Sequence, residues 1–310
     1  MRIGIDLGGS KIEVAALDRG GAIRLRRRIP TPAGHYPATI AAVKELVESS
    51  EAALGTRASV GIAIPGAISP ATGLVKNANS TCLIGRPFDR DVMAALGRPV
   101  RFANDANCFA LSEATDGAGQ GARVVVGVIL GTGVGGGIVV NGQVLTGANA
   151  IAGEWGHTPL PWPRDEERPG PLCYCGKHGC IEAFLSGPSL TRDHREAGGE
   201  SREPAEIVAR AAAGEAAAGA SLARYLDRLA RGLAMAINII DPDIIVLGGG
   251  LGQIAQLYSE VPARWGAYVF SDRVATRLRP PRWGDSSGVR GAAWLWPEGD
   301  GEASWRSIES

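Results

Sequence analysis

Apolar residues recur along the first hundred positions in short runs separated by turn residues, a pattern that predicts strands alternating with helices. The expected strands are Arg2 to Leu7, Lys11 to Leu17, Ile23 to Ile29, Val60 to Ile64 and Val100 to Ala103. A helix is expected over Thr39 to Ala53, and another begins with Asn104 and Asp105, whose side-chain oxygens can cap free backbone N–H groups. Residues 1–114 are therefore predicted to form a small α/β domain.

The pattern of the first strands returns in the second part of the chain. An apolar strand over Val124 to Leu130 precedes a glycine turn with Thr132 and a strand over Ile138 to Val140, just as the first strand precedes a glycine turn with Ser10. This repetition predicts two related halves. A long amphipathic helix is expected later, because apolar residues recur there at spacings of three and four: Leu222, Leu226, Leu229, Leu233, Ile237 and Ile240.

The order of these elements predicts the domain boundaries. A large α/β domain is expected over residues 115–286, with a buried strand over Ile244 to Leu247. A helix expected over residues 287–298 is predicted to pack back on the small domain, and residues 299–310 are expected to form a polar tail. The length of 310 residues agrees with two domains, since it exceeds the usual size of a single core.

Charge and composition exclude several classes of protein. The 32 basic residues balance 32 acidic ones, and the chain carries neither a DNA-reading helix pair nor an extended basic stripe, so no nucleic-acid partner is expected. The arginines between positions 24 and 28 are interpreted as the solvated face of a strand. No apolar run approaches the roughly 20 residues of a membrane span, and Met1 leads into the first strand without a signal-peptide pattern. We therefore expect a cytoplasmic protein with no membrane partner.

Four potential metal ligands gather in one short stretch: His157, Cys173, Cys175 and Cys180. The pattern Cys-x-Cys-Gly-x-x-Gly-Cys supplies tight turns at its glycines, and His157 completes a closed Cys₃His set typical of a structural zinc site. The alternative is that the cysteines are small buried hydrophobes, which is the interpretation preferred for the isolated Cys82 and Cys108. Glu154 and Glu182 flank the stretch, so a metal that folds it back would bring two carboxylates together.

Glycine turns after apolar strands are the second candidate for chemistry. Gly131, Gly133 and Gly136 satisfy G-x-G-x-x-G, but a strand follows them in place of the helix that dinucleotide binding requires. Two strand-turn-strand hairpins remain, each able to direct backbone N–H groups and a hydroxyl toward an anion, although both could be simple tight turns. Asp6 could hold Mg²⁺ through water. The residues expected to bind ATP phosphates are Asp6, Gly8, Gly9, Ser10, Lys11, Gly131, Thr132, Gly133, Gly248, Gly249 and Gly250.

Taken together, these motifs resemble the ROK family of sugar kinases and repressors, within the actin-like ATPase fold. The matching segments are Asp6-Leu-Gly-Gly-Ser-Lys11, Ile64-Pro-Gly66, Asn104-Asp105-Ala-Asn107, Gly131-Thr-Gly133, Glu154-Trp-Gly-His157, the cysteine motif ending at Glu182, and Leu247-Gly-Gly-Gly250. The resemblance implies an α/β, ribonuclease H-like fold with two domains around an active-site cleft and a zinc-binding loop over residues 157–182. It covers nearly the whole chain, and Ser10 departs from the usual threonine while keeping the hydroxyl.

The resemblance also implies roles for individual residues. Asp105 corresponds to the catalytic general base, and Mg²⁺ and ATP are the expected cofactors. The residues expected around the sugar are Gly66, Asn79, Asn104, Asp105, Glu154, His157 and Glu182, with one nitrogen of His157 on zinc and the other facing the sugar. Three further segments resemble bacterial manno(fructo)kinases of this family: Val75 to Thr81, His157 to Trp162 and Gly284 to Trp296.

Several functions stay open at this point. The expected activity is ATP-dependent phosphorylation of fructose or mannose at the 6-hydroxyl. A homodimer is expected, because members of the family that the chain resembles are usually dimers or larger. The alternatives are a glucokinase or N-acetylhexosamine kinase, a sugar-sensing repressor, and a zinc-stabilised module without catalysis. The repressor is disfavoured because no DNA-binding helices precede the strand at Arg2, and the inert module because Asp105 is intact. The remaining histidines, His35, His178 and His194, are expected at the surface.

Overall fold

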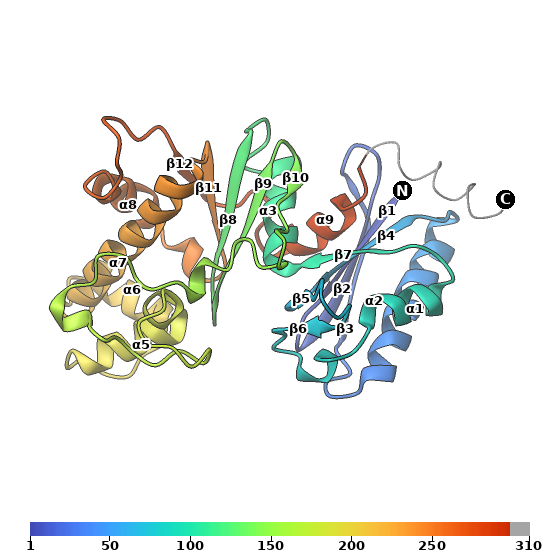
Figure 1. Cartoon of the computed structure of the whole chain (residues 1–310), viewed down its shortest axis with the longest axis horizontal. Helices are drawn as coiled ribbons and strands as arrows, with labels where there is room; N and C mark the ends of the chain where they lie inside the picture. The colour runs from blue at the N-terminus through green and yellow to red at the C-terminus, as the bar shows by residue number, and fades with distance from the viewer. Residues whose placement is uncertain (298–310) are drawn as a thin grey trace. The chain divides into compact units, whose positions relative to one another are not determined.

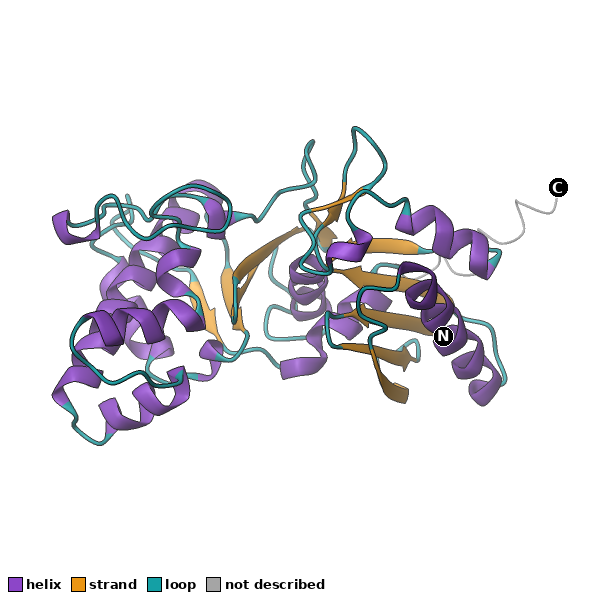
Figure 2. Ribbon diagram, turned by 90° about the horizontal axis from the view of Figure 1, so that it is seen from below, coloured by secondary structure: helices purple, strands orange, loops and turns teal. Residues whose placement is uncertain are grey.

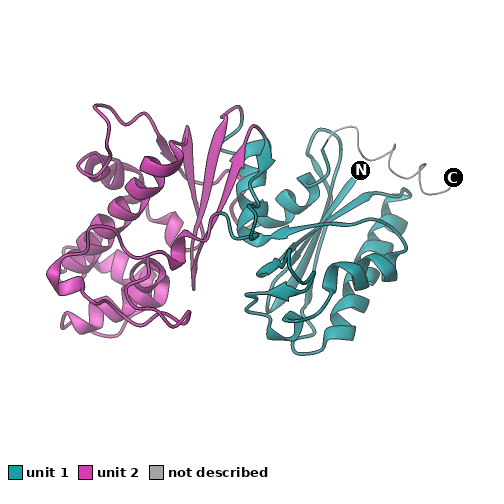
Figure 3. Ribbon diagram, viewed as in Figure 1, with its two compact units in different colours: residues 1–120, 142–152, 285–310 teal, residues 121–141, 153–284 magenta. Residues whose placement is uncertain are grey.

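The computed structural model describes residues 1–297, and the predicted polar tail over 299–310 lies outside the described residues. The chain divides into two compact units (Figure 3). Unit 1 contains residues 1–120 and 142–152 and the described residues from 285 onward, and unit 2 contains residues 121–141 and 153–284. The expected boundary at 114/115 falls at the end of α3 (Asp105–Thr115), whereas the structure assigns residues 142–152 to unit 1 as well.

Unit 1 is built on a mixed five-stranded sheet with the order β3-β2-β1-β4-β7. The meander of β1 (Arg2–Leu7), β2 (Lys11–Leu17) and β3 (Ile23–Pro30) is antiparallel, while β4 (Ser59–Ile64) and β7 (Arg101–Asn104) run parallel to β1. Residues alternate between the two faces, so Ile62 packs in the cluster beneath α1 (Tyr36–Leu54) and α2 (Phe88–Leu96). The next residue, Ala63, packs instead with Cys108 of α3 and Ala292 of α9 (Ser287–Trp294).

Two glycines explain why α9 lies so close to this sheet. A side chain at Gly4 of β1 would overlap the carbonyl oxygen of Val289, and one at Gly61 of β4 would overlap that of Ala292. The helix expected over residues 287–298 is thus observed over Ser287–Trp294, against β1, β4 and α3 of unit 1 (Figure 1). The short elements of this unit are β5 (Ala67–Ile68), β6 (Val75–Lys76), η1 (Thr81–Leu83) and β10 (Gln143–Val144); η5 spans Gly284–Ser286.

Unit 2 repeats the strand order of unit 1. Its strands lie in the order β9-β8-β11-β12, which matches β2-β1-β4-β7 in both order and direction. These strands are β8 (Val124–Leu130), β9 (Val134–Val140), β11 (Ile244–Gly248) and β12 (Arg277–Arg279). The prediction of two related halves is therefore confirmed at the level of strand topology.

The helices of unit 2 lie on one side of its sheet, as Figure 2 shows. They are α4 (Glu182–Leu185), α5 (Gly187–Glu196), α6 (Pro204–Ala212), α7 (Ala216–Ile240) and α8 (Leu257–Trp265), with 3₁₀ turns η2 (Trp155–His157), η3 (Asp165–Glu167) and η4 (Leu251–Gln253). The apolar stripe predicted on α7 is confirmed: Leu222, Leu226, Leu229, Leu233 and Ile237 are buried in the core of the unit. Within residues 1–297, no helix combines the length and the apolar character that crossing a bilayer would require.

The strand expected at Ile138 begins four residues earlier, at Val134. The glycine run of Gly135 to Gly137 therefore lies inside β9 and not in a loop. The reason is the segment from Gly153 to His157, which packs on the strand: Trp155 donates from Nε1 to the Gly135 carbonyl at 3.0 Å, and a side chain at Gly136 would come within 2.8 Å of the Trp155 ring. The absence of side chains in β9 makes room for this segment.

Candidate functional site

The turn between β1 and β2 carries the first set of expected phosphate ligands. The Gly8 N–H donates to the Lys11 carbonyl at 3.0 Å, which closes the turn. Thr31 supports it from the next strand end, donating from Oγ1 to the Gly8 carbonyl at 2.7 Å and from its N–H to the Ser10 carbonyl at 3.0 Å. Gly9, Ser10 and Lys11 are exposed. The hydrogen bonds from Thr31 fix the backbone of the turn, while the side chains of Ser10 and Lys11 are exposed to solvent.

Asp6 lies near the end of β1, opposite Glu13 of β2. Burial raises the pKa of Asp6 to about 6, with further contributions from the negative charges of Asp105 and Glu13, which outweigh the opposing charges of Lys11 and Arg28. The negative charges around the Asp6 carboxylate, that of Asp105 first, outweigh the positive ones. Such a position suits a hydrated Mg²⁺ ion that also contacts phosphate oxygens.

The arginines of β3 are exposed, as the sequence predicts, and two of them also pair with a buried carboxylate. Arg26 and Arg28 donate to the two carboxylate oxygens of Glu13, each at 2.6 Å, and Glu13 is only 3% exposed. Burial of this carboxylate requires such pairing. Two of the arginines therefore neutralise Glu13 while their side chains stay exposed, so the expected solvated face is confirmed and has this additional role.

Asp105 and Asn104 are brought together at the start of α3. Asn104 is the N-cap: its Oδ1 accepts from the Ala106 N–H at 2.9 Å, and its Nδ2 donates to the Gly66 carbonyl at 3.0 Å. Asp105 Oδ1 accepts from the same Ala106 N–H at 2.8 Å, and the side chain is exposed. Both residues thus have fixed orientations, with the Asp105 carboxylate directed to solvent. Asn79 is also exposed and, with Gly9, lines a cavity of about 170 Å³ in unit 1.

The turn between β8 and β9 carries the second set of phosphate ligands. The Gly131 N–H donates to the Gly133 carbonyl at 2.9 Å, and the Gly131 carbonyl accepts from the Gly187 N–H of α5 at 2.8 Å. Glu182 Oε2 accepts from the Val134 N–H at 2.8 Å. One oxygen of Glu182, an expected sugar ligand, therefore fixes the beginning of β9.

A pocket of about 820 Å³ in unit 2 joins the second and third glycine loops. Its wall contains Gly131, Thr132 and Gly250, because the carboxyl ends of the parallel strands β8 and β11 lie at the same edge of the sheet. Sequence reasoning missed the rest of the wall: Gly187, Pro188, Thr191, Glu203, Pro204, Ala205, Val208, Leu251, Gln253 and Ile254. The one signal was the Gly187-Pro188 pair, which opens a helix directly after the cysteine motif.

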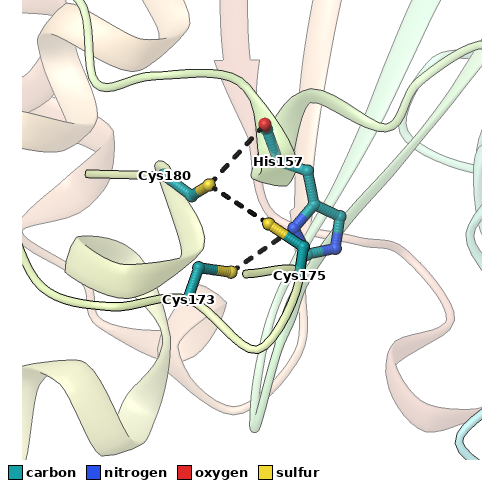
Figure 4. Close-up of side chains that lie close together, drawn as sticks. All are labelled: His157, Cys173, Cys175 and Cys180. Atoms are coloured by element: carbon teal, nitrogen blue, oxygen red, sulfur yellow. Dashed lines mark hydrogen bonds between the residues drawn. The ribbon is translucent and has the colours of Figure 1, made fainter. Parts of the chain in front are cut away.

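The four expected zinc ligands converge, as Figure 4 shows. All four ligand atoms lie within 4.8 Å of one another; Cys173 Sγ is 3.6 Å from His157 Nδ1, and Cys175 Sγ is 3.6 Å from Cys180 Sγ. A tetrahedral ion with bonds of about 2.0 Å to nitrogen and about 2.3 Å to sulfur needs ligand atoms at roughly these separations. The cluster therefore fits zinc. Burial raises the pKa of Cys180 to about 12, so metal binding has to displace thiol protons.

The second nitrogen of His157 faces a tyrosine that the sequence reasoning did not single out. His157 Nε2 is 2.8 Å from the hydroxyl oxygen of Tyr174, and the two rings meet edge to face at 5.0 Å. Desolvation of this hydroxyl, followed by the charges of Glu182 and Glu154, raises the pKa of Tyr174 to about 12. The sequence does place Tyr174 between two of the cysteine ligands, Cys173 and Cys175, which could have indicated a position near the metal cluster.

Other residues near the metal cluster have mainly structural contacts. Glu154 is exposed, on the segment that packs against β9, while Trp155 packs against the core of unit 2. Trp162 is half exposed and its ring lies 5.5 Å from that of Tyr268. Of the three remaining histidines, His35 and His178 are exposed as expected. His194 is fully buried, with Nδ1 at 3.0 Å from Ser221 Oγ, so its expected surface position is wrong.

Comparison with known proteins agrees with this architecture. The sequence model of the ROK family matches residues 2–299. The chain belongs to the ROK family. The N-acetyl-D-glucosamine kinase of Yersinia pseudotuberculosis serotype O:3 (strain YPIII) is 39% identical over 299 residues, covering 95% of this chain and 98% of the relative. A ROK hexokinase from Thermus thermophilus has 30% identity and a TM-score of 0.85, covering 100% of this chain and 99% of that one.

A ROK family glucokinase from Streptomyces griseus, solved in complex with glucose and AMPPNP, has 26% identity and a TM-score of 0.75. The alignment covers 96% of this chain and 99% of the glucokinase. The expected fold class is confirmed: both units have the α/β architecture with mixed sheets of the ROK family's actin-like ATPase fold.

The expected specificity for fructose or mannose is wrong, because the Yersinia relative is an N-acetyl-D-glucosamine kinase. The structure explains why the segments that suggested manno(fructo)kinase say little about the sugar. In the segment from His157 to Trp162, Thr158 donates to the Trp155 carbonyl at 2.7 Å and Leu160 is buried. The segment from Gly284 to Trp296 contains α9, which packs on the sheet of unit 1. Apart from His157, which belongs to the metal cluster, these residues of the two segments serve packing.

Proposed function

We propose that this chain is an ATP-dependent N-acetylhexosamine kinase that transfers the γ-phosphoryl group to the 6-hydroxyl of N-acetyl-D-glucosamine. The observation that carries the choice of sugar is the 39% identity, over 95% of the chain, with the Yersinia N-acetyl-D-glucosamine kinase. Features of each unit support the reaction class. Unit 1 has an exposed carboxylate at a helix start and a glycine turn, and unit 2 has a second glycine turn and a pocket of suitable size for a nucleotide.

We assign the nucleotide to the pocket of unit 2. Gly131, Thr132 and Gly250 line it, and the Thr132 hydroxyl and the turn N–H groups supply donors for phosphate oxygens. In unit 1 the exposed Ser10 and Lys11 supply a second hydroxyl and a positive charge. Mg²⁺ held through Asp6 and phosphate oxygens would neutralise charge on the transferred group. Phosphoryl transfer depends mainly on such positioning and charge neutralisation.

Asp105 is assigned as the general base. A sugar hydroxyl is a weak nucleophile, and Asp105 accepts its proton as the new oxygen–phosphorus bond forms and the bond from phosphorus to the departing ADP oxygen breaks. Proton transfer of this kind contributes roughly 10² to 10⁴ in rate. The hydrogen bond from the Ala106 N–H to Oδ1 fixes the carboxylate in the exposed orientation that this role needs.

The remaining predicted residues are assigned to sugar binding. Asn104, Asn79 and the Gly66 backbone contact the sugar from unit 1, and Glu154 and Glu182 accept from its hydroxyls. Glu182 Oε2 accepts from the Val134 N–H, and Oε1 lies 4.0 Å from Cys173 Sγ, toward the metal cluster. Zinc, bound by His157 and the three cysteines, holds the loop that presents these carboxylates.

Substitution of the base tests this assignment. Asp105→Asn preserves the cap geometry but removes the proton acceptor, so kcat with N-acetyl-D-glucosamine and ATP should fall by at least about 100-fold. ATP binding and the melting temperature should stay close to those of the wild type. The control is Asp165→Asn, at an exposed position outside the site, which should retain full turnover. With the wild-type protein, ³¹P NMR should identify the product as the 6-phosphate of the sugar. Retention of a tenth of the wild-type kcat by Asp105→Asn would contradict the assignment of Asp105 as the base.

A further inference from the structure

The beginning of α9 lies against the carboxyl group of Asp6, within unit 1. Gly288 is the second residue of this helix, and a side chain there would come 2.7 Å from Asp6 Oδ2, 3.4 Å from its Cγ and 4.0 Å from its Oδ1. Outside the helix itself, these are the three nearest atoms to that position. The missing side chain of Gly288 therefore makes room for the carboxylate, which turns Oδ2 toward the helix and Oδ1 away from it.

The other glycines around α9 make room for backbone and not for a charged group. Gly4 of β1 and Gly61 of β4 admit carbonyl groups of α9, and Gly291 of α9 admits the Cys108 carbonyl group of α3. Each of these three glycines brings the helix close to a neighbouring element, so their role is packing. Gly288 differs from them, because the group that it admits is assigned to Mg²⁺.

Buried polar contacts hold α9 in place on both sides of this position in the sequence. Ser287 donates from Oγ to Glu113 Oε1 of α3 at 2.7 Å, and both residues are fully buried. Arg290 is 2% exposed; it donates to the Gly21 carbonyl at 2.9 Å and pairs with Asp116. The helix cannot shift without breaking these contacts, each of which would leave a buried polar group without a partner.

We propose that Gly288 is a positioning residue for the metal-binding carboxylate: it keeps Asp6 in the orientation that binds hydrated Mg²⁺. This inference rests on the proposed function. Because α9 is anchored, a methyl group at position 288 displaces the carboxylate, which can rotate, and not the helix. Mg²⁺ demands a nearly ideal octahedral arrangement of its ligands and waters, so a rotated carboxylate binds it less well.

The test is Gly288→Ala, with Gly219→Ala as the matched control. Gly219 lies in α7, and a side chain there would meet no atom within 4 Å. Electron paramagnetic resonance measures Mn²⁺ binding in the presence of the ATP analogue AMPPNP, without any sugar. Gly288→Ala should raise the Kd for Mn²⁺ at least about fivefold, as expected for a weakened contact to a charged group, and Gly219→Ala should leave it unchanged. Both variants should fold, because alanine is a better helix former than glycine.

Steady-state kinetics should show the same selectivity. With ATP and N-acetyl-D-glucosamine, Gly288→Ala should raise the apparent KM for Mg²⁺ at least about fivefold and change the KM for the sugar less than about twofold. The effect should also depend on the carboxylate. In an Asp6→Ala background, Gly288→Ala should change Mn²⁺ affinity less than about twofold, because the group that it displaces is gone. If Gly288→Ala alone does not fold, Asp6→Ala should restore the fold by removing the overlap.

Three results would overturn the inference. The first is an unchanged Mn²⁺ affinity in folded Gly288→Ala, and the second is an equal loss of affinity in the Asp6→Ala background. The third is a failure to fold that Asp6→Ala does not repair, since the added methyl group would then clash with something other than the carboxylate. A wild-type protein whose Mn²⁺ binding responds to Gly288→Ala, but which phosphorylates no N-acetylhexosamine, would contradict the proposed function alone.

Discussion

At the scale of single residues, the folded protein holds Asp6 in a form that costs stability. The pKa of this carboxyl rises from 3.8 to about 6, because burial and the nearby Asp105 and Glu13 disfavour its charge. Between these two pH values, the unfolded chain is ionised while the folded protein still retains the proton. The folded state therefore loses stability as the pH rises from about 4 to about 6, and the loss is complete above that window. The Mg²⁺ site that we propose at Asp6 would account for a carboxylate that costs stability.

Asp6→Asn should therefore stabilise the protein while abolishing magnesium-dependent turnover. In magnesium-free buffer, the free energy of unfolding of Asp6→Asn should rise above that of the wild type as the pH increases from 4 to 6. The difference should then stay constant, at up to about 3 kcal/mol, since each pKa unit corresponds to about 1.4 kcal/mol. Thermal unfolding across pH 4 to 8 measures it. Asp18→Asn is the control with the opposite sign, because hydrogen bonds from Ala22 and Arg24 lower the pKa of Asp18. Our interpretation of Asp6 fails if Asp6→Asn is less stable at pH 8.

Residues with a distinctive local pattern could be located from the sequence. Asn104 and Asp105 follow a predicted strand at a helix start, and the cysteine spacing identifies the metal ligands. The contact between Tyr174 and His157 could not be predicted, because it depends on where the tyrosine hydroxyl lies relative to His157 Nε2 in the folded chain. His194 was misplaced for a similar reason: its sequence surroundings are polar, and only tertiary packing against Ser221 buries it.

At the scale of elements, the loop that carries the metal cluster is anchored a second time, on α7. Glu167 of η3 is 6% exposed; its Oε1 accepts from Arg228 and its two oxygens accept from Arg231, each at 2.8 Å. Burial alone would raise its pKa, but the hydrogen bonds from Arg231, Arg228 and the Arg164 N–H lower it to about 2. The network thus links the loop to the core of unit 2 through charges that neutralise one another.

Glu167→Gln should destabilise the protein by about 1 to 3 kcal/mol at pH 7, because it removes one of the carboxylates that neutralise two buried arginines. Arg228 keeps its ion pair with Asp193, and Arg231 keeps its ion pair with Asp227. A depressed pKa gives stability that is present above about pH 4.5 and is lost as the pH falls toward 2. The difference between wild type and Glu167→Gln in urea unfolding should accordingly shrink from pH 7 to pH 3. Glu166→Gln, at the exposed neighbouring position, should unfold like the wild type. A difference that does not depend on pH would contradict the account.

Metal removal tests the other anchor of the loop. Cys175→Ser removes a ligand at an exposed position, so the protein should lose zinc and bind N-acetyl-D-glucosamine at least about tenfold more weakly. ATP affinity should change little, since the nucleotide pocket is built from other elements. Metal analysis and calorimetry measure these effects, with Cys82→Ser as the control that keeps its zinc. About one zinc per chain in Cys175→Ser would show that the ligand set is wrong.

Elements were predictable where local pattern and tertiary contact agree. The strands β1 and β2 have the predicted bounds, and the stripe on α7 packs as expected. The beginning of β9 was not predictable, because a glycine run normally indicates a loop. Here the glycines are needed so that Trp155 can lie against the strand, a contact between residues distant in sequence.

At the scale of the whole molecule, the two units share one strand order. Unit 1 holds Asp6 and Asp105, and unit 2 holds the pocket that we assign to the nucleotide and the cluster that fits zinc. The repeated hairpin pattern predicted two related halves, and the resemblance to the ROK family implied the fold class. The sugar was not predictable, because most residues of two of the three segments used to choose it serve packing. Substrate choice depends on a few hydrogen-bonding groups, and sequence pattern does not specify their directions.

The central claim is that the protein is an N-acetylhexosamine kinase. The most direct test is kcat/KM with ATP and Mg²⁺ in a coupled assay that compares N-acetyl-D-glucosamine with fructose, mannose and glucose. Because a site that hydrogen-bonds a substrate group rejects analogues that lack it, N-acetyl-D-glucosamine should exceed each free hexose by at least about tenfold. A kcat/KM for fructose, mannose or glucose equal to or above that for N-acetyl-D-glucosamine would contradict the claim.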